Sequence, residues 1–540
     1  MSSHDDRPAH KVGLADDEAV FAPSITPTTR PSTDVAAGSL VPDIEPKLRN
    51  RHVFGIAIGI IAAAIVYLIF PNQVPQGVVD ALAARDLTTS PHTLKATAAI
   101  AVLMGVWWMT EAIPLAATAL VPLAAFPLLG VGTIQQASAP YASPTIFLFM
   151  GGFVLALAMQ RWNLHRRIAL RTVLLVGTKP KRLVLGFMVA TGFLSMWVSN
   201  TATAVMMLPI GISVLALVGQ LEHNDGRRTN FGTALMLGIA YAASIASLST
   251  LIGTPPNALL RAYLADNHDI NIGFGQWMLM GTPVAWLLLV ICWWLLVSVL
   301  YKPEIDELPG GRNVIRDELQ KMGPMSTQEK LVALVFVVAA LSWVFIPTLF
   351  PGTPLGDEVI AMLVALALFL IPARPKGGIG LMDWKAAQDI PWDVLLLFGG
   401  GLSLSSAFGY SGLSQWIGEQ AKALDGLPTV VIVLACVTLV IFLTEMTSNT
   451  ATAAAFLPIM GGVAIGMGMD VMLLTVPIAM AATCAFMLPV ATPPNAIAFG
   501  SGYLQIRQMV KAGLWLNLIS IVLLTVTVFT LGRIFLGIQI

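Results

Sequence analysis

The same twelve-residue stretch occurs twice in this sequence, at 199–210 and again at 448–459. Nine of the twelve positions are identical, and each copy begins with Ser-Asn-Thr. Both copies lie in the middle of a long apolar run, where an amide and two hydroxyls without partners would cost several kcal/mol in hydrocarbon. The polar groups of each triplet must therefore be occupied, and this requirement constrains the fold more than any other feature.

A second motif follows each copy of the first: Gly-Thr-Pro-Pro-Asn at 253–257 and Ala-Thr-Pro-Pro-Asn at 491–495. Two prolines cannot lie inside a continuous helix, but proline is favourable in the first turn of a new one. Each motif therefore predicts a span divided into two half-helices. Carbonyls before the break can coordinate a cation, and the new N-terminus offers N–H groups to an anion. The Ser-Asn-Thr tips offer similar groups, so we interpret the four stretches as one binding site.

Composition places the chain in a lipid bilayer. Hydrophobic residues make up 56% of the 540 residues and charged residues only 11%, with a mean hydropathy of +0.78; a soluble domain has roughly 25% charged residues. The net charge is zero, so a nucleic-acid partner is not indicated. The three cysteines are not at metal-ligand spacing, and the seven histidines lie outside the duplicated motifs. A disulfide framework, a zinc site and a histidine-based catalytic centre are therefore disfavoured.

The sequence divides into a tail, eleven membrane spans and two hairpins, because a span needs roughly 20 apolar residues. Residues 1–50 are polar, and we predict that they form a disordered cytoplasmic tail. The run 183–220 is about twice as long as one span and has arginine on both sides, at Arg182 and Arg227, which favours a re-entrant hairpin. The predicted spans are 53–70, 95–112, 114–131, 144–162, 231–265, 276–301, 329–349, 356–372, 391–409, 472–503 and 512–537, and the hairpins are 183–220 and 427–464.

The second half of the sequence repeats the order of the first. The glycine pairs that begin at Gly151 and Gly400 are 249 positions apart, the same distance that separates Ser199 from Ser448. Spans two to six form one repeat and spans seven to eleven the other, and an odd number of crossings in each forces opposite orientations. The sequence thus predicts an inverted repeat. Lys and Arg residues cluster before the first span and between span four and the first hairpin, so both regions are expected in the cytoplasm.

Charge around the four motifs points to a cation that accompanies an anionic substrate. The motifs contain no Lys, Arg or His, and Glu445 has the wrong sign to hold an anion. Helix N-termini supply roughly half an elementary charge each, which offsets the charge of an anion only if all of them point at it. Bound cations supply positive charge without that demand, so we expect substrate binding itself to require a cation.

The paired motifs, and nearly everything after residue 50, resemble the divalent anion/sodium symporters, which carry di- and tricarboxylates or sulfate. The resemblance implies an elevator-type transporter that works as a homodimer, with Na⁺ as the coupling ion. It also implies a scaffold at 51–180 (spans one to four) and 329–426 (spans seven to nine), a transport domain at 181–301 and 427–540, and a cytoplasmic linker at 302–328.

The resemblance further implies the residues of the site. Threonine at position 450 keeps the second triplet intact, as in members that prefer four-carbon dicarboxylates, and this makes citrate less expected. The implied sodium sites are Ser195, Ser199, Asn200 and the Gly253 carbonyl, with a pseudo-symmetric mate of Thr444, Thr447, Asn449 and Ala491. The implied substrate contacts are Asn200, Thr201, Thr254, Asn449, Thr450, Thr492 and Pro493.

Two charged residues near the motifs are open to more than one interpretation. Glu445, next to Thr444, either senses protons or cations in the second site or has a structural role. Its counterpart in the first repeat is Met196, so a role common to both repeats is excluded. Arg261 lies one turn beyond Asn257 and either pairs with a substrate carboxylate or extends to the membrane interface, and we favour the interface.

The leading hypothesis is a sodium-coupled transporter that imports C4-dicarboxylates such as succinate, malate and fumarate across the inner membrane of a bacterium. A sodium-independent di/tricarboxylate exchanger of the same fold is the alternative, although the intact Ser195, Ser199 and Thr444 argue against it. Helix breaks paired by inverted symmetry suit alternating access better than the open pore of a channel. An intramembrane hydrolase would need a base beside a nucleophile, and neither Ser-Asn-Thr motif contains His, Lys or Asp, so we do not expect an enzyme.

Overall fold

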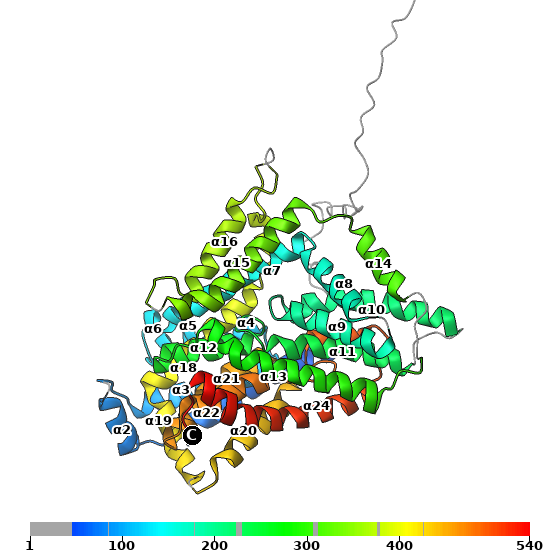
Figure 1. Cartoon of the computed structure of the whole chain (residues 1–540). Coiled ribbons are helices and arrows are strands. Elements are labelled where there is room, and N and C mark those ends of the chain that lie inside the picture. Colours follow the sequence, from blue (N-terminus) through cyan, green and yellow to red (C-terminus); the bar gives the residue numbers. More distant parts are fainter. Residues whose placement is uncertain are drawn as a thin grey trace, which may run out of the picture. The chain divides into compact units, whose positions relative to one another are not determined.

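The computed structural model describes residues 46–84, 86–177, 179–222, 229–305, 311–350, 352–374, 378–424 and 426–540. The chain divides into two units at Asn50, and the unit Asn50–Ile540 contains everything below except the start of the first helix. All regular secondary structure in the described residues is helical, which confirms the all-α prediction (Figure 1). Residues 1–45 of the predicted tail, and Arg227, lie outside the described residues.

The first half of the chain contains thirteen α-helices, a short 3-10 helix and a π-helical turn. They are α1 (Pro46–Ile69), α2 (Gln76–Ala83), α3 (Pro91–Thr110), α4 (Leu115–Thr118), α5 (Val121–Leu128), α6 (Ile134–Ser138), η1 (Ala139–Ala142), α7 (Pro144–Arg161), α8 (Leu164–Val176), α9 (Pro180–Ser195), α10 (Asn200–Glu222), α11 (Asn230–Ser247), α12 (Pro255–His268), α13 (Phe274–Trp294) and the π-helical η2 (Leu295–Leu300).

The second half ends in the same way, with a π-helical continuation of its last long helix. Its elements are α14 (Gly311–Lys321), α15 (Thr327–Leu349), α16 (Asp357–Leu370), α17 (Trp384–Ala387), α18 (Trp392–Ser411), α19 (Leu413–Ala421), η3 (Lys422–Leu424), α20 (Thr429–Thr444), α21 (Asn449–Gly466), α22 (Val471–Thr483), α23 (Pro493–Gly500), α24 (Ile506–Thr527) and η4 (Val528–Leu536).

Nine helices among the described residues are long and apolar enough to cross a membrane. Eight of them coincide with predicted spans, and the ninth is α21, which belongs to the second predicted hairpin. Three predicted spans are shorter than a full crossing: α4–α5, which contains Pro122 and Pro127, the 14-residue α16, and the 13-residue α22. The structure therefore confirms a multi-span helical protein, while the count of eleven spans and the re-entrant path of the hairpins stay predictions.

Both pairs of sequence motifs interrupt helices at the predicted places. The first hairpin region divides into α9 and α10 around residues 196–199, and the second divides into α20 and α21 around 445–448. The proline pairs occupy the first turn of α12 and of α23, where their missing N–H groups need no partner. Residues 248–254 separate α11 from α12, and residues 484–492 separate α22 from α23, so each motif divides a span into two helices.

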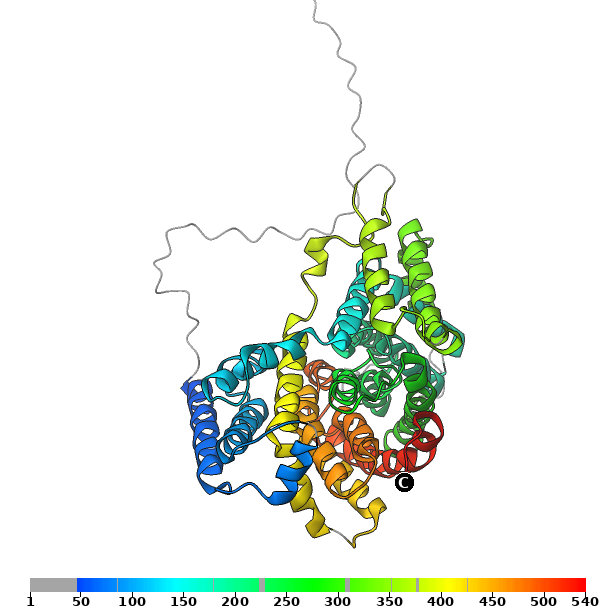
Figure 2. The ribbon, with the colours of Figure 1, turned by 90° about the vertical axis from the view of Figure 1, so that its left-hand side faces the viewer.

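The two halves contact each other crosswise. α10 packs against α23, and α12 packs against α21; likewise α11 packs against α23, and α12 against α22. In Figure 2 the green helices of the first half lie beside the orange helices of the second half. The contacts follow the repeat: α10 and α21 are equivalent, and each packs against the helix that begins with the Thr-Pro-Pro-Asn motif of the other half. The contacts bring together the helices that carry the four motifs, which are far apart in sequence.

Two matched glycines allow close contacts between the halves on other helices as well. A side chain at Gly151 in α7 would come within 2.6 Å of the Ala361 carbonyl in α16, and one at Gly400 in α18 would overlap the Ala119 carbonyl that follows α4. The approach of α7 to α16 is therefore as close as the approach of α18 to the residue that follows α4. The matched glycines serve close helix packing.

Three ion pairs connect α7 and α8 to the second half of the chain. The end of α7 is joined to the segment after α16, and the start of α8 is joined to α14 and to the start of α15. The pairs are Arg161–Asp383 (2.6 Å), Arg166–Glu318 (2.6 Å) and Arg167–Glu329 (2.9 Å).

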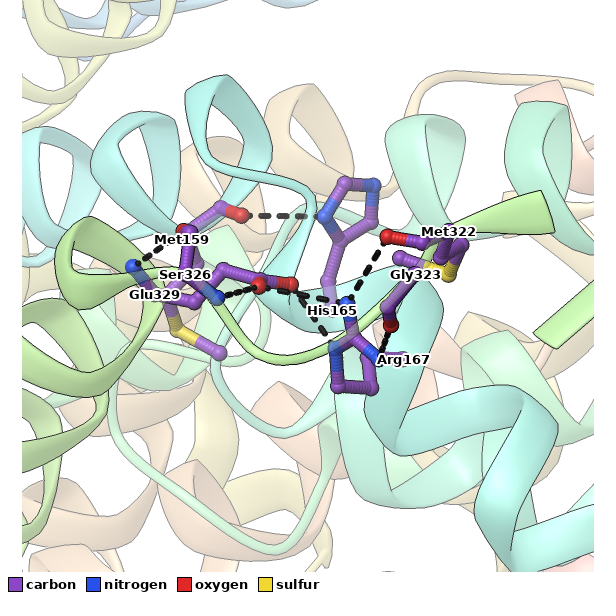
Figure 3. A network of polar contacts seen from close by, with 7 residues as sticks. All are labelled: Met159, His165, Arg167, Met322, Gly323, Ser326 and Glu329. Carbon is purple, nitrogen blue, oxygen red and sulfur yellow. Dashed lines mark hydrogen bonds and ion pairs between the residues drawn. The ribbon is translucent and has the colours of Figure 1, made fainter. Parts of the chain in front are cut away.

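Figure 3 shows the buried pair of this junction in detail. Arg167 also donates to the Gly323 carbonyl (2.9 Å) and the Met322 carbonyl (3.3 Å), and Glu329 accepts from the Ser326 N–H (2.7 Å) as part of the cap of α15. Burial lowers the pKa of the nearby His165, whose Nδ1 lies 3.0 Å from the Met159 carbonyl oxygen. The junction ties α8, which leads into α9, to the linker and to α15.

Candidate functional site

The first hairpin motif builds a small cluster of oxygen atoms. α9 ends at Ser195 and α10 begins at Asn200, so the two residues face each other across a short turn. The Ser195 hydroxyl lies 2.6 Å from Asn200 Oδ1 and 2.7 Å from the carbonyl oxygen of Ala243 in α11. Ser195 and Ala243 are buried and Asn200 is half-buried. These three oxygens are the first oxygen cluster.

The second hairpin motif repeats the arrangement. The Thr444 hydroxyl, at the end of α20, lies 2.8 Å from Asn449 Oδ1, at the start of α21. It also lies 2.8 Å from the carbonyl oxygen of Ala482 in α22. These three oxygens are the second oxygen cluster. As in the first cluster, the hydroxyl lies at the last residue of one helix and the asparagine at the first residue of the next, while the carbonyl comes from near the end of the helix before the break.

Each cluster has too few protons to join its oxygens. A hydroxyl carries one proton, so Ser195 can donate to Asn200 or to the Ala243 carbonyl but not to both, and the same holds for Thr444. One close oxygen–oxygen contact in each cluster therefore stays repulsive unless a cation approaches it. Hydroxyl, amide and carbonyl oxygens are the ligands that hard cations prefer, so both clusters fit a hard cation such as Na⁺.

Other predicted sodium ligands make contacts of their own. The Ser199 hydroxyl accepts from the Ala202 N–H (3.3 Å) and so caps α10. The Thr447 hydroxyl donates to the Leu443 carbonyl (3.0 Å) or to the hydroxyl of Thr452 (2.6 Å), one turn into α21. The carbonyls of Gly253 and Ala491 lie in the two breaks and stay predictions.

The asparagine of each Thr-Pro-Pro-Asn motif holds the break that precedes it. The side-chain amide of Asn257 donates to the carbonyls of Thr250 (2.9 Å) and Leu248 (3.4 Å). Asn495 donates in the same way to Leu488 (3.1 Å) and Ala485 (3.2 Å). Both asparagines are fully buried. These amides replace the helical donors that the interrupted carbonyls lose.

The predicted substrate residues differ in how available they are. Thr201 and Pro493 are exposed and Asn200 and Asn449 are half-buried, whereas Thr450 is buried. The Thr492 hydroxyl accepts from the Asn495 N–H (3.3 Å) as the cap of α23. The hydroxyl of Thr254 lies 3.2 Å from that of Thr483 in α22, a contact that joins the two halves of the chain.

Glu445 makes structural contacts with the second break. Its carboxylate accepts hydrogen bonds from three successive backbone N–H groups, those of Phe486, Met487 and Leu488, at 2.7–3.1 Å. It also accepts from the side-chain amide of Asn517 in α24 at 2.7 Å. Both carboxylate oxygens are thus occupied by donors, and the side chain is buried. These contacts favour the structural alternative of the two that the sequence left open.

Arg261 corrects the expectation of a side chain that extends to the membrane interface. The residue is buried and lies 2.5 Å from Glu358 and 3.5 Å from Asp357, at the start of α16. Its Nε also donates to the Ile272 carbonyl (3.0 Å). The guanidinium is therefore occupied by two protein carboxylates, because α16 begins beside α12, which the sequence could not reveal.

The two breaks are covered to very different degrees. Val490 in the second break is 81% exposed, whereas its counterpart Ile252 in the first break is 8% exposed. The hairpin turns follow the same order, because Met446 is 76% exposed and its counterpart Trp197 is 9% exposed. Trp197 stacks on the ring of Phe274 and so is held inside the protein.

Reasoning from the sequence missed four participants: the carbonyls of Ala243 and Ala482 and the side chains of Asn517 and Thr483. Every residue has a carbonyl, so residue type alone cannot mark one as a ligand. Asn517 is an isolated polar residue in the apolar run of α24. That isolation was a usable signal, because an amide in such a run needs partners.

Comparison with known proteins identifies the family of this chain. The family described as "Sodium:sulfate symporter transmembrane region" matches residues 58–538. The sodium-dependent dicarboxylate transporter SdcS of Staphylococcus saprophyticus is 45% identical over 450 residues, which cover 82% of this chain and 87% of the relative. The transporter of the same name from Staphylococcus aureus is 44% identical over 82% of this chain and 86% of its own length.

Among solved structures, the Alcanivorax borkumensis YdaH transporter shares the fold, with a TM-score of 0.53 and 15% identity. The match covers 83% of this chain and 99% of that transporter. Sodium is the coupling ion that both the family description and the Staphylococcus relatives name. The resemblance noted in the paired motifs is confirmed: this chain is a multi-pass membrane protein that belongs to the sodium:sulfate symporter family of divalent anion/sodium symporters.

Proposed function

We propose that this protein is a sodium-coupled symporter that imports C4-dicarboxylates, such as succinate, malate and fumarate, across the inner membrane of a bacterium. The observation that carries the proposal is the pair of matched oxygen clusters, Ser195–Asn200–Ala243 and Thr444–Asn449–Ala482. Each cluster offers hydroxyl, amide and carbonyl oxygens close together, which are ligands that a hard cation such as Na⁺ prefers. The printed function of the Staphylococcus relatives, sodium-dependent dicarboxylate transport, supports the choice of substrate.

In this proposal the substrate carboxylates lie at the N-termini of four helices. α10, α12, α21 and α23 all begin in the region where the motifs pack crosswise, and their first N–H groups attract anions. Thr201 and Pro493 are exposed there and Asn200 and Asn449 are half-buried, so these residues are available to a ligand. Sodium in the clusters would supply the positive charge that the motifs lack and fix the two asparagine side chains.

Sodium entry would also supply the driving force. Each net positive charge that moves inward gains about 2.3 kcal/mol per 100 mV of membrane potential. A dianion accompanied by three sodium ions would carry one net charge, so uptake would be electrogenic. An electroneutral uptake would indicate two sodium ions for each dianion.

The proposal includes an elevator mechanism in a homodimer. The hairpins and broken spans would move together, since α9 to α13 and α20 to α24 interlock crosswise, past a scaffold that contains α3, α7, α15, α16 and α18. Exposure of the second break but not the first supports a conformation open on one side. Cysteine pairs between scaffold and hairpins should crosslink in mutually exclusive sets, and complete crosslinking of one set with intact transport would contradict the sliding movement.

The direct test is succinate binding to the purified protein by calorimetry, with sodium or with choline. We expect binding in sodium and at least a tenfold weaker affinity in choline, about 1.4 kcal/mol or more. Uptake into proteoliposomes under the same two conditions measures coupling, and sulfate in place of succinate tests the other anion that the family name allows. Equal affinity in choline would favour the sodium-independent exchanger.

A further inference from the structure

Glu445 occupies the point at which the two repeats differ most. The second break, residues 484–492, is longer than the first, residues 248–254. In the first repeat Leu248 and Ser249 still donate to carbonyls of the last turn of α11. Their counterparts Phe486 and Met487 have lost such partners, and Pro489 follows where the first repeat has Leu251. Proline disfavours helix in the residue before it, so Leu488 does not return to a helix within the break.

The longer break leaves three successive N–H groups without helical acceptors inside an apolar region, where each would cost free energy. The Glu445 carboxylate receives all three at 2.7–3.1 Å and is held from the other side by Asn517 at 2.7 Å. Hydrogen bonds to an ionised group are about twice as strong as neutral ones. The carboxylate therefore acts as a single acceptor for the whole unwound segment.

The same segment is connected to the second oxygen cluster at two points. Glu445 directly follows Thr444, and the Ala482 carbonyl lies only a few residues before Phe486. Asn495 holds the segment from the opposite direction by donating to the carbonyls of Ala485 and Leu488. A shift of the segment would therefore move Ala482 away from Thr444.

We propose that Glu445 is a positioning residue for the second cation cluster: by holding residues 486–488 it keeps the Ala482 carbonyl beside Thr444 and Asn449. That the second cluster binds a cation rests on the proposed function. That Glu445 anchors the second break rests on the hydrogen bonds alone. In the first repeat the corresponding connection is a single hydrogen bond, from the Thr250 hydroxyl to the Met196 carbonyl at 2.6 Å. The two clusters are thus built alike but supported by different chemistry.

Two variants of Glu445 separate position from charge. Glu445→Gln keeps the shape but turns one acceptor oxygen into a donor that faces the N–H groups. Glu445→Asp keeps the charge but is shorter by one methylene, so it cannot reach all three N–H groups. Positioning predicts that both variants raise the sodium concentration for half-maximal succinate binding by about tenfold. The maximal binding at saturating sodium should stay near that of the wild type.

Hydrogen exchange measured by mass spectrometry on the purified full-length protein tests the anchoring itself. Amide exchange of residues 486–488 should accelerate by about tenfold or more in both variants, while residues 248–250 of the first break stay unchanged. Asn517→Ala, which removes one of the donors to the carboxylate, should act in the same direction by a few-fold and serves if the Glu445 variants fold poorly. Glu419→Gln, a surface residue paired with Lys422, is the matched control and should change neither measurement.

Three results would overturn the inference. Unchanged exchange at 486–488 in Glu445→Gln would remove the anchoring. Accelerated exchange with an unchanged sodium response would separate the segment from the cluster. A wild-type sodium response in Glu445→Asp would show that charge, and not position, is what Glu445 supplies. A wild-type protein that binds succinate equally with and without sodium would instead overturn the proposed function, and the exchange measurement would still decide the anchoring.

Discussion

The two broken spans of this protein share a motif but not an environment. Their Thr-Pro-Pro-Asn segments start α12 and α23 in the same way, and each asparagine holds its own break through two carbonyls. Yet Ile252 in the first break is 8% exposed and Val490 in the second is 81% exposed. Every residue of the first break is buried, whereas the second break has residues 487–489 half-buried and Val490 exposed.

The buried charges are distributed unequally as well. The first repeat has Arg261 in α12, paired with carboxylates of α16, where the second repeat has Phe499. The second repeat has Glu445, bound to backbone N–H groups, where the first has Met196. The comparison teaches that duplication preserved the chemistry of the clusters, while the attachments around them diverged. In a protein that exposes its site to one side at a time, such a difference between equivalent parts is expected.

The largest effect should be seen in the exposure of the two breaks. In detergent without substrate, Val490→Cys should react with a thiol reagent at least about a hundredfold faster than Ile252→Cys. A buried thiol at position 252 reacts only after the protein opens locally, which costs free energy. The fully buried native Cys484 supplies the rate of an inaccessible thiol in both proteins. Reaction rates are measured by mass spectrometry, and similar rates at the two positions would remove the asymmetry from which this comparison starts.

Arg261 tests the attachment on the covered side. Arg261→Gln leaves the buried carboxylate of Asp357 beside Glu358 without a cation, and an unpaired buried charge costs roughly 3–5 kcal/mol. We expect a matching loss in the free energy of unfolding, measured by denaturation in detergent. Phe499→Leu, at the equivalent position of the second repeat, should cost less than about 1.5 kcal/mol. Equal losses would show that the ion pair contributes nothing specific to the first repeat.

The asparagines test whether the two clusters are of equal importance. Asn200→Ala and Asn449→Ala each remove an oxygen of a cluster and a predicted substrate contact. Each should lower succinate uptake at limiting sodium by about a hundredfold, equivalent to two lost polar contacts of roughly 1.4 kcal/mol each. Uptake into proteoliposomes is the measurement, with surface Glu419→Gln as control. Wild-type rate and affinity in either variant would exclude that tip from the site.

The smallest effect concerns the hydroxyl that distinguishes the clusters, serine in the first and threonine in the second. Thr444→Ser keeps the hydroxyl and loses one buried methyl, so the sodium requirement for uptake should rise by only about two- to fivefold. Thr444→Val keeps the volume and removes the hydroxyl, and should raise the requirement by tenfold or more, a change of about 1.4 kcal/mol. If the two variants behave alike, the Thr444 oxygen is not a ligand.

Much of the candidate site was visible in the sequence. The repeated Ser-Asn-Thr and Thr-Pro-Pro-Asn motifs located both helix interruptions, and the structure places α10, α21, α12 and α23 at those positions. Ser195 and Asn200 were predicted as ligands of one sodium site and Thr444 and Asn449 as ligands of the other, and within each set these two residues are in contact. These features are local, because proline chemistry and helix capping act within a few residues.

Predictions that depended on the path of the chain were less complete. Arg261 was expected at the membrane interface because it lies near the end of an apolar segment, but α16 brings Asp357 and Glu358 to it. Helix α16 has only 14 residues and α22 only 13, so the number of full crossings cannot be obtained from apolar runs alone. The boundaries of the scaffold and the transport domain remain proposals for the same reason.

The sequence by itself determined that this protein is a helical membrane protein, that its two halves are duplicates, and that polar groups and helix breaks meet in apolar surroundings. Only the tertiary structure decided which backbone carbonyls complete the clusters, which donors Glu445 receives, and which of the two breaks is exposed. The physical reason is the range of the interactions. Hydropathy and proline geometry are properties of short segments, whereas a contact such as Thr444 with the Ala482 carbonyl depends on how separate helices pack.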